Sequence, residues 1–385
     1  MELTLFVDHQ CNLRCRYCYT GDKFKRPMSA ETMRTAVDLA LQGAPDRFGV
    51  SFFGGEPLLH KALVRQTVEH TEAAVAALPT AKPEVQFFMN TNATLIDDEA
   101  IEIMAAPRRF TCFVSLDGSR EVHDEYRVTA AGKGSFEQVL RGLERLSRAQ
   151  IPYQLLAVYS PATAPKLGDT LSTLLSLNAT KVHLAANFAA DWTEESIQGL
   201  SAGLHAAGDV WIEHFRAGRV FAVEPFHAKI LSHLKGGMPC PPRCLLGGCE
   251  WTITPQGHIY PCAQMVNEDT RADLRIGHIE RGIDLAALLK MRQAKDRVEK
   301  TCAECELRDR CQSHCGCRHV ALSGELGVIT ATLCEIEAAH IAEADRVAET
   351  LYAEGCESFI EYYYKRNWLP VRGGEMWEQR RAREP

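Results

Sequence analysis

The stretch MELTLFVDHQCNLRCRYCYT, residues 1–20, decides how the chain is interpreted. Its apolar run at 3–7 is expected to form a strand, and cysteines follow directly at positions 11, 15 and 18. The spacing C-x3-C-x2-C puts three thiols on one short loop, where they can face one metal centre. Structural zinc usually takes four ligands, whereas three thiolates on a four-iron cluster leave one iron open to a small molecule. The loop is therefore a candidate catalytic iron site, with a zinc loop or chance core cysteines as alternatives.

The composition argues against a secreted disulfide-rich protein, a membrane-spanning protein and a nucleic-acid-binding protein. The 385 residues include fifteen cysteines, and thirteen of them fall into three groups, at 11–18, 240–262 and 302–334. Disulfide frameworks belong to small secreted domains, but this N-terminus has no basic flank before an apolar core, so we expect a cytoplasmic protein with metal-binding thiols. No apolar run approaches the roughly 18 residues that span a bilayer. The net charge of −7 argues against a nucleic-acid partner.

Outward from the first cysteines, apolar runs alternate with helical patterns as far as about residue 190. The candidate strands are 3–7, 49–53, 85–89, 111–115, 153–159 and 181–184. The candidate helices are one opened by Ser29, then 59–77, 97–105 and 135–148. Strands joined by helices predict parallel βαβ units, which right-handed crossovers would curl into a barrel or part-barrel. Active sites on such scaffolds lie at the carboxyl ends of the strands.

Three further motifs lie just past predicted strands. They are GGEP at 54–57, NTNAT at 90–94 and SLDG at 115–118, with Arg127 following the last. Together with C-x3-C-x2-C and the aromatic Tyr17 before the third cysteine, they resemble the radical SAM superfamily. The resemblance implies an α/β fold with a partial (β/α)6 TIM-like barrel and a [4Fe–4S] cluster on Cys11, Cys15 and Cys18. It also implies reductive cleavage of S-adenosylmethionine to a 5′-deoxyadenosyl radical, which abstracts a substrate hydrogen.

The resemblance also implies a set of side chains for S-adenosylmethionine. It consists of Tyr17, Gly54, Gly55, Glu56, Pro57, Asn92, Ser115, Asp117 and Arg127. The glycines allow close approach of backbone, and a guanidinium such as that of Arg127 matches the carboxylate of the cofactor. Glu56 has two open roles, because it could hold the ammonium group or accept backbone hydrogen bonds that shape its loop. A buried ion pair or a strand-end turn is the alternative for Arg127 and Ser115.

The C-terminal cysteines resemble a second module, the SPASM domain of peptide and protein maturases. Cys302, Cys305, Cys311 and Cys315 have the spacing C-x2-C-x5-C-x3-C, and Cys244, Gly257 and Cys262 fit the expected lead-in. The family pattern implies two auxiliary clusters, one on Cys244, Cys249, Cys262 and Cys315, and the other on Cys302, Cys305, Cys311 and Cys334. Three [4Fe–4S] clusters and three parts are then expected, a barrel with connecting helices at 1–235, a SPASM domain at 236–340, and a C-terminal helix and tail at 341–385. Zinc knuckles are the alternative.

Two cysteines in these groups, Cys240 and Cys317, are left without a role. Cys317 stands in a CGC step beside the predicted ligand Cys315, and it is a candidate alternative ligand, substrate-handling thiol or packing residue. A CGC here resembles thioether-forming maturases of ribosomal peptides. Cys317 is the one candidate catalytic residue from the sequence.

The resemblance predicts an oxidoreductase that modifies a ribosomally made peptide, with a crosslink such as a thioether as the favoured product. Sulfatase maturases share this architecture and use an acidic residue directly after the cysteine that corresponds to Cys262. This chain has Ala263 at that position, which weakens the sulfatase interpretation. Glu250 or Glu268 could supply the acidic group instead. The sequence also leaves open an enzyme that acts on a small molecule and a metal-bearing interaction protein. We expect an electron donor such as flavodoxin or ferredoxin. Because the chain starts at the first strand, we expect any leader peptide to use the barrel, the last helix or a separate leader-binding protein.

Overall fold

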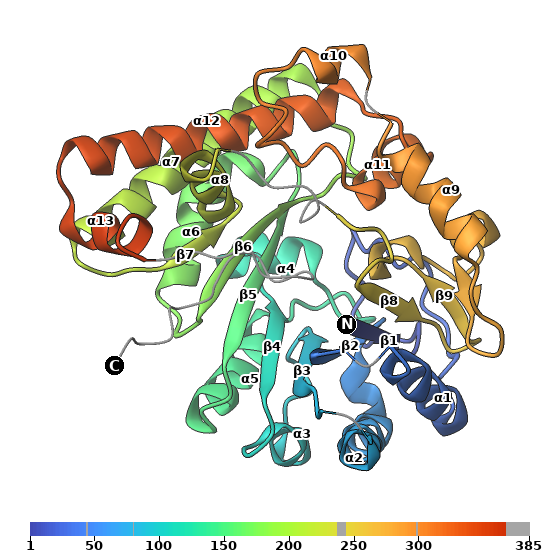
Figure 1. Cartoon of the computed structure of the whole chain (residues 1–385). Coiled ribbons are helices and arrows are strands. Elements are labelled where there is room, and N and C mark those ends of the chain that lie inside the picture. Colours follow the sequence, from blue (N-terminus) through green and yellow to red (C-terminus); the bar gives the residue numbers. More distant parts are fainter. Residues whose placement is uncertain (44, 80, 237–243, 298, 367–385) are drawn as a thin grey trace. The chain divides into compact units, whose positions relative to one another are not determined.

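The computed structural model describes residues 1–385 except 44, 80, 237–243, 298 and 367–385 (Figure 1). Cys240 therefore lies outside the described residues. The chain divides into two compact units. Unit 1 contains residues 1–116, 123–154 and 245–293, and unit 2 contains residues 117–122, 155–244 and 294–385.

Unit 1 is built on a sheet whose strand order is β11-β10-β9-β8-β1-β2-β3-β4. The strands are β1 (Glu2–Phe6), β2 (Arg47–Phe53), β3 (Glu84–Thr91), β4 (Phe110–Ser115), β8 (Glu250–Ile253), β9 (His258–Tyr260), β10 (Gly277–His278) and β11 (Gly282–Ile283). Strands β1 to β4 are parallel, and so is the pair β1–β8, whereas β8 to β11 form antiparallel pairs. The parallel part matches the predicted βαβ arrangement.

Four helices of unit 1 begin within two residues of the predicted starts, at positions 30, 61, 98 and 136, whereas the two short helices at 263–265 and 272–274 are additions. The helices of this unit are α1 (Ala30–Leu41), η1 (Pro57–His60), α2 (Lys61–Ala77), α3 (Asp98–Met104), α5 (Phe136–Arg148), η3 (Ala263–Met265) and η4 (Ala272–Leu274). Ser29 caps α1 by accepting from the Thr32 N–H at 3.0 Å, and Asp97 caps α3 by accepting from Ala100. The apolar stripe of α5 is buried. In Figure 1, α1, α2 and α3 follow one another beside the blue strands of this unit.

Unit 2 contains three parallel strands in the order β5-β6-β7. They are β5 (Tyr153–Tyr159), β6 (Lys181–Ala186) and β7 (Ala222–Glu224), and the helices are η2 (Ala164–Lys166), α6 (Leu167–Leu175), α7 (Glu194–Arg216), α8 (Phe226–Leu234), α10 (Lys300–Ala303), α11 (Gly316–Ser323), α12 (Ala331–Ala353) and α13 (Glu357–Tyr363). Two helices, α4 (Arg120–Tyr126) and α9 (Leu285–Lys295), contain residues of both units. The core of unit 2 includes the fully buried rings of Trp211, Phe215, Phe226 and Phe359.

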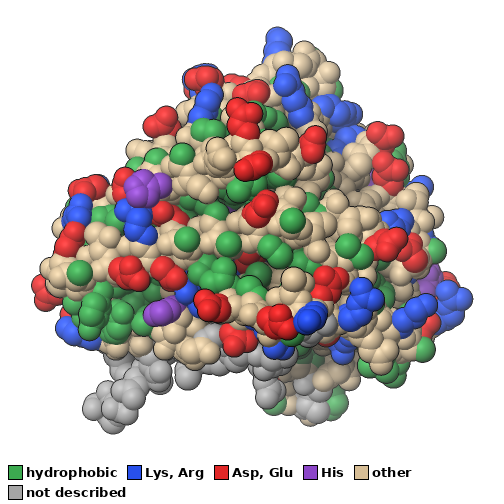
Figure 2. All heavy atoms as spheres, turned by 90° about the horizontal axis from the view of Figure 1, so that it is seen from above, with side chains coloured by type: hydrophobic (Ala, Val, Ile, Leu, Met, Phe, Trp, Pro, Cys, Tyr) green, Lys and Arg blue, Asp and Glu red, His purple; other side chains and the backbone are tan. Residues whose placement is uncertain are grey.

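All six predicted strands are present, with ends that move by at most two residues. The short β7 and the strands β8 to β11 are additions, because no local pattern marks them. Strand β8 pairs with β1, and α12 runs through position 340 without a break. No helix of the described residues is long and apolar enough to cross a membrane. On the face seen in Figure 2, acidic and basic side chains are interspersed, unlike the basic stripe typical of nucleic-acid binding.

Candidate functional site

The three-cysteine loop follows β1 and is held by backbone pairing with residues 126–129. Arg14 N–H donates to the Val128 carbonyl at 2.6 Å, and Arg16 N–H donates to the Tyr126 carbonyl at 3.0 Å. All three cysteines are half-buried, and within the loop Cys18 N–H donates to the Cys15 carbonyl. The loop is therefore fixed on one side by β1 and on the other by the segment that carries Arg127.

The thiols of this loop have different environments. Burial, and then the nearby Glu56 carboxylate, raise the pKa of Cys11 to about 12. Burial acts in the same direction on Cys18, but the Thr20 hydroxyl at 3.2 Å and the Lys23 ammonium at 3.1 Å from its sulfur outweigh it and lower the pKa of Cys18. Lys23 thus supplies a positive charge where a thiolate is needed.

The glycines of GGEP allow close approach to the chain's own backbone. A Cβ on Gly54, whose φ is +127°, would lie 2.5 Å from the Asp8 carbonyl oxygen, and one on Gly55 would lie 2.1 Å from that of Gln10. Gly55 and Glu56 N–H groups donate to these same two carbonyls. The motif therefore packs against the three residues that lead into Cys11, so it positions the cysteine loop.

Glu56 is buried and accepts three hydrogen bonds from the protein. Its carboxylate receives the Leu58 N–H at 3.1 Å, the Thr91 hydroxyl at 2.7 Å and the Asn92 N–H at 2.8 Å. Burial, which outweighs these donors, raises its pKa to about 7. Of the two open roles, the geometry supports that of shaping the loop, because GGEP and NTNAT are joined through this carboxylate. Pro57, buried, starts η1 directly after it.

Asn92 connects NTNAT with the cysteine loop. Its amide nitrogen donates to Asn12 Oδ1 at 2.9 Å and lies 3.8 Å from Cys11 Sγ, while its amide oxygen accepts from Thr94. Asn12 in turn donates to the Thr94 hydroxyl. Sequence reasoning missed Asn12, although it lies in the cysteine motif.

Arg127 lies against the cysteine loop as well. Its guanidinium carbon is 5.2 Å from the centroid of the Tyr17 ring, which also stacks on Tyr126. Ser115 is half-buried at the last position of β4. Asp117, which belongs to unit 2, is buried and accepts from the Val158 N–H of β5 at 3.0 Å, so its carboxylate anchors that strand.

The predicted ligands of one auxiliary cluster lie together in unit 2. After burial, the charges of Cys311, Cys302 and Cys305 are what raise the pKa of Cys334 to about 11. Cys302 and Cys305 interact with each other as well. Four cysteines that are up to 32 positions apart along the chain are thus brought into one electrostatic neighbourhood.

The predicted ligands of the other auxiliary cluster divide between the units. Cys249 and Cys262 belong to unit 1, where the Cys249 carbonyl accepts from Glu2 at 2.7 Å. Cys244 and Cys315 belong to unit 2. The pKa of Cys315 lies well below its usual range because the thiols of Cys244 and Cys317 form hydrogen bonds with it. Cys315 Sγ and Cys317 Sγ are 3.2 Å apart.

The donor chemistry of these sets suits iron–sulfur clusters. Each set consists of thiols, and Lys23 or Arg318 offers positive charge beside them. Among the described residues, no group of three or more His, Cys, Asp or Glu is arranged to hold one metal ion. A four-iron cluster does not need ligands that converge on one metal ion, because each of its irons binds a separate thiolate.

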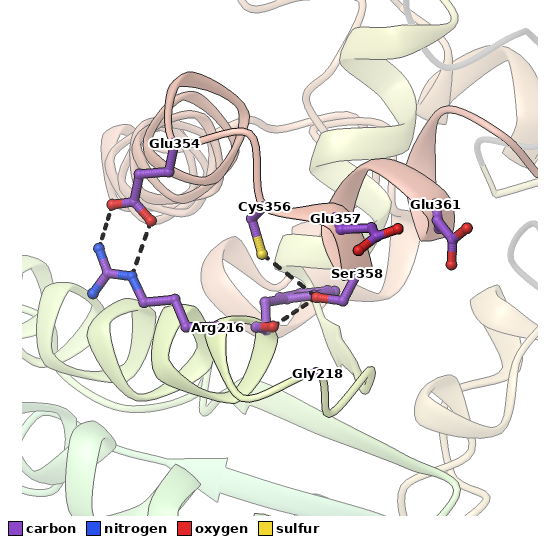
Figure 3. A pocket seen from close by; sticks show the side chains of 8 residues that line it. Arg216, Gly218, Glu354, Cys356, Glu357, Ser358 and Glu361 are labelled. Carbon is purple, nitrogen blue, oxygen red and sulfur yellow. Dashed lines mark hydrogen bonds and ion pairs between the residues drawn. The ribbon is translucent and has the colours of Figure 1, made fainter.

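A pocket of about 480 Å³ in unit 2 lies outside all of these predictions (Figure 3). Its lining consists of Phe215, Arg216, Gly218, Glu354, Cys356, Glu357, Ser358 and Glu361. The Arg216 guanidinium points to the Glu354 carboxylate, with Nε at 3.0 Å, and the Cys356 thiol points to the Ser358 hydroxyl. No local motif could reveal it, because Arg216 and Glu354 are 138 positions apart.

Several curated proteins similar to this chain are anaerobic sulfatase-maturating enzymes. The cysteine-type anaerobic sulfatase-maturating enzyme of Clostridium novyi (strain NT) is 26% identical over 329 residues, covering 79% of this chain and 84% of that protein. The serine-type anaerobic sulfatase-maturating enzyme of Klebsiella aerogenes is 25% identical over 326 residues, covering 79% and 76%.

Solved structures show the same fold. Native anSMEcpe with bound AdoMet has a TM-score of 0.76 at 19% identity, covering 91% of this chain and 99% of that one. Streptococcus suis SuiB bound to precursor peptide SuiA has a TM-score of 0.58 at 16% identity, covering 83% and 72%. The predicted fold class is thereby confirmed.

The family comparison agrees with the geometry of the cysteine loop. Residues 7–167 match the model of the Radical SAM superfamily, and this range includes Cys11, Cys15, Cys18, GGEP and Arg127. Residues 7–167 therefore form a radical SAM domain, and the chain as a whole has the fold of native anSMEcpe and of Streptococcus suis SuiB.

Proposed function

We propose that this chain cleaves S-adenosylmethionine and uses the resulting radical to install a crosslink, such as a thioether, in a ribosomally made peptide. The observation that carries the proposal is the cysteine loop within the radical SAM domain, held by GGEP, Glu56 and Asn92. An iron–sulfur cluster on this loop would supply the electron that breaks the sulfonium bond.

Each of the side chains around the cysteine loop has a different role in holding the loop or the cofactor. Lys23 favours the thiolate of Cys18, and Asn92 holds Asn12 and approaches the Cys11 sulfur. Arg127 offers a guanidinium for a carboxylate, and the Tyr17 ring beneath it keeps its plane in place. Each of these side chains binds or orients, and none is needed as an acid or base in the cleavage.

The substrate class rests on the relatives and on the C-terminal cysteines. SuiB was solved with a precursor peptide, and the sulfatase-maturating enzymes act on sulfatases by name. In thioether formation a substrate carbon would lose one hydrogen atom to the radical that S-adenosylmethionine supplies. The carbon radical then bonds to a substrate cysteine sulfur, which loses its proton, and one electron is left over. The auxiliary cysteine sets would hold clusters that accept this electron.

Formylglycine formation is the second candidate, because two sulfatase-maturating enzymes match this chain over 329 and 326 residues. That reaction needs a base near the substrate. Ala263 is buried and apolar, and Glu268 accepts from the Asp22 N–H at 2.9 Å, which engages it with the backbone. Asp269 is buried against His258 and Tyr260. The apolar side chain at Ala263 favours the crosslink over formylglycine, and Glu250 and Glu268 are the candidate bases for the alternative reaction.

The test is mass spectrometry after anaerobic turnover with reductant and S-adenosylmethionine. One substrate is a cysteine-containing peptide encoded beside the gene, and the other is a peptide with the cysteine or serine of a sulfatase active site. We expect the first to lose two hydrogens and one alkylatable thiol, and the second to remain unchanged. The matched control is Cys15→Ala, which should leave both peptides unmodified. An aldehyde on the sulfatase peptide, detected with a carbonyl-specific reagent, would overturn the crosslink proposal in favour of formylglycine.

A further inference from the structure

Three thiols of unit 2 lie together at the start of α11. Cys315 Sγ is 3.2 Å from Cys317 Sγ, and the Cys244 thiol forms a hydrogen bond with Cys315. Cys317 is 9% exposed. The resemblance assigns Cys244 and Cys315 to one auxiliary cluster and gives Cys317 no place in it, yet the Cys317 sulfur lies within hydrogen-bond distance of the Cys315 sulfur.

The backbone fixes both thiols of the CGC step in this position. Cys315 is the residue before α11, and its carbonyl accepts from the N–H groups of Arg318 and His319 at 3.0 and 3.2 Å. The His319 ring is buried, with Nε2 beside the Ser313 carbonyl and Nδ1 3.1 Å from the Gly327 N–H. The first turn of the helix is therefore anchored on both sides, so the proximity of the two sulfurs comes from packed structure.

A positive charge accompanies the pair. The Arg318 guanidinium interacts with both Cys315 and Cys317, and it is held by the Glu337 carboxylate at 2.5 Å. It also lies over the Phe188 ring at 4.7 Å. Arg318 can therefore offset the charge of a thiolate at either position, which a cysteine used only for packing would not require.

We propose that Cys317 is a second ligand for the auxiliary-cluster iron that the family pattern gives to Cys315, and that the two thiols bind it in alternation. Each iron of a [4Fe–4S] cluster takes one external ligand, so only one of the two can be bound at a time. On exchange, the arriving thiol loses its proton and the departing thiolate gains one, and the oxidation state of the cluster does not change. This inference rests on the auxiliary clusters of the proposed function, but not on the identity of the substrate.

Iron analysis after anaerobic reconstitution tests the alternation. Three filled clusters amount to about twelve irons per chain. We expect Cys315→Ser and Cys317→Ser each to keep about twelve. The double variant leaves that cluster three thiolates, so it should lose up to about four irons or show an open iron site in its electron paramagnetic resonance spectrum. Cys244→Ser should behave like the double variant, since no second thiol duplicates Cys244. Cys356→Ser, which removes a thiol of the same unit beside Ser358, is the matched control and should keep the full content.

Electron paramagnetic resonance of the reduced proteins gives a second readout. Cys315→Ser and Cys317→Ser should each perturb the signal of one cluster, because the wild type would contain both ligation states. A loss of about four irons in Cys315→Ser alone, with an unchanged spectrum for Cys317→Ser, would show that Cys317 only packs. A wild type with only about four irons would also refute the inference, because no auxiliary cluster would exist. Circular dichroism of each variant separates lost ligation from lost fold.

Discussion

Glu56 shows how a motif side chain can work through the chain's own backbone. Its carboxylate accepts from Leu58, Thr91 and Asn92, and it is buried while doing so. The loop that carries Asn92 is thus tied to the GGEP turn, and Asn92 reaches toward the Cys11 sulfur. Glu56 therefore determines where the cysteine loop meets the neighbouring strand end.

At the residue scale we predict that Glu56→Gln destabilises the fold by about 1 to 3 kcal/mol. The amide keeps one acceptor, but its NH2 group would face a backbone or hydroxyl donor, so at least one hydrogen bond is lost. Chemical denaturation measures the change in the free energy of unfolding. The control is Glu69→Gln, an exposed position on α2, which should change it by no more than about 0.5 kcal/mol. Equal effects of the two variants would contradict the role of Glu56.

The identity of the site residues could be predicted from the sequence, but their partners could not. Spacing along eight residues is enough to select Cys11, Cys15 and Cys18, because those thiols share one loop. The bonds of Glu56 and Asn92 join segments 35 to 81 positions apart, and no local pattern encodes them. For the same reason the sequence left both roles of Glu56 open.

At the element scale, α5 supports the NTNAT loop through a glycine. A Cβ on Gly142 would lie 2.2 Å from the Ala93 carbonyl oxygen, so the helix can approach this loop closely only at a residue without a side chain. Ala93 itself has φ of +57° and is fully buried. The helix therefore fixes the backbone next to Asn92.

We predict that Gly142→Ala destabilises the protein, although alanine is the better helix former by about 1 kcal/mol. The clash with backbone at Ala93 has no flexible side chain to absorb it, and overpacking of this kind costs about 1 to 3 kcal/mol. The expected result is a lower midpoint of thermal unfolding, together with slower S-adenosylmethionine cleavage because Asn92 moves. Arg141→Ala, an exposed neighbour on the same helix, is the control and should leave both unchanged. A stabilised Gly142→Ala protein would show that the loop can move aside.

The strands and helices with strong periodicity were predictable, and those defined by distant pairing were not. The run at 153–159 alternates in burial along its whole length and agrees with β5 (Tyr153–Tyr159). By contrast, β8 (Glu250–Ile253) has four residues and exists because it pairs with β1, some 248 positions earlier. A pattern of four residues carries too little information to indicate a partner at that distance.

At the scale of the whole molecule, a network of buried ion pairs lies in unit 2, the unit that also contains most of the C-terminal cysteines. Lys229 of α8 is fully buried and binds Glu337 of α12 at 2.5 Å, and Arg318 of α11 binds the other oxygen of the same carboxylate. Burial alone would raise the pKa of Glu337, but Lys229 and Arg318 hold it well below its usual range. The network thus joins three helices through one carboxylate.

The same network contacts the backbone on both sides of Cys311, a predicted cluster ligand. Lys229 Nζ also donates to the Arg310 carbonyl at 2.8 Å, and the Gln312 N–H donates to Glu337 Oε2 at 2.8 Å. Cys311 lies between these two contacts in sequence. Removal of one charged side chain from this network leaves the others buried with fewer partners. The loss in the free energy of unfolding should therefore be far larger than for an exposed ion pair.

We therefore predict that Lys229→Met destabilises unit 2 by about 3 to 5 kcal/mol and lowers the iron content by about four, as Cys311 loses its supports. Thermal unfolding and iron analysis of the anaerobically prepared protein measure the two effects. Arg216→Met is the matched control, because it removes an exposed ion pair with Glu354 in the same unit. It should lower the midpoint of thermal unfolding far less than Lys229→Met does, with no loss of iron. If Lys229→Met keeps its full iron content despite lower stability, the network supports the helices alone and the cysteine segment is held by other contacts. If both variants behave alike, the buried carboxylate does not couple the fold of this unit to its metal.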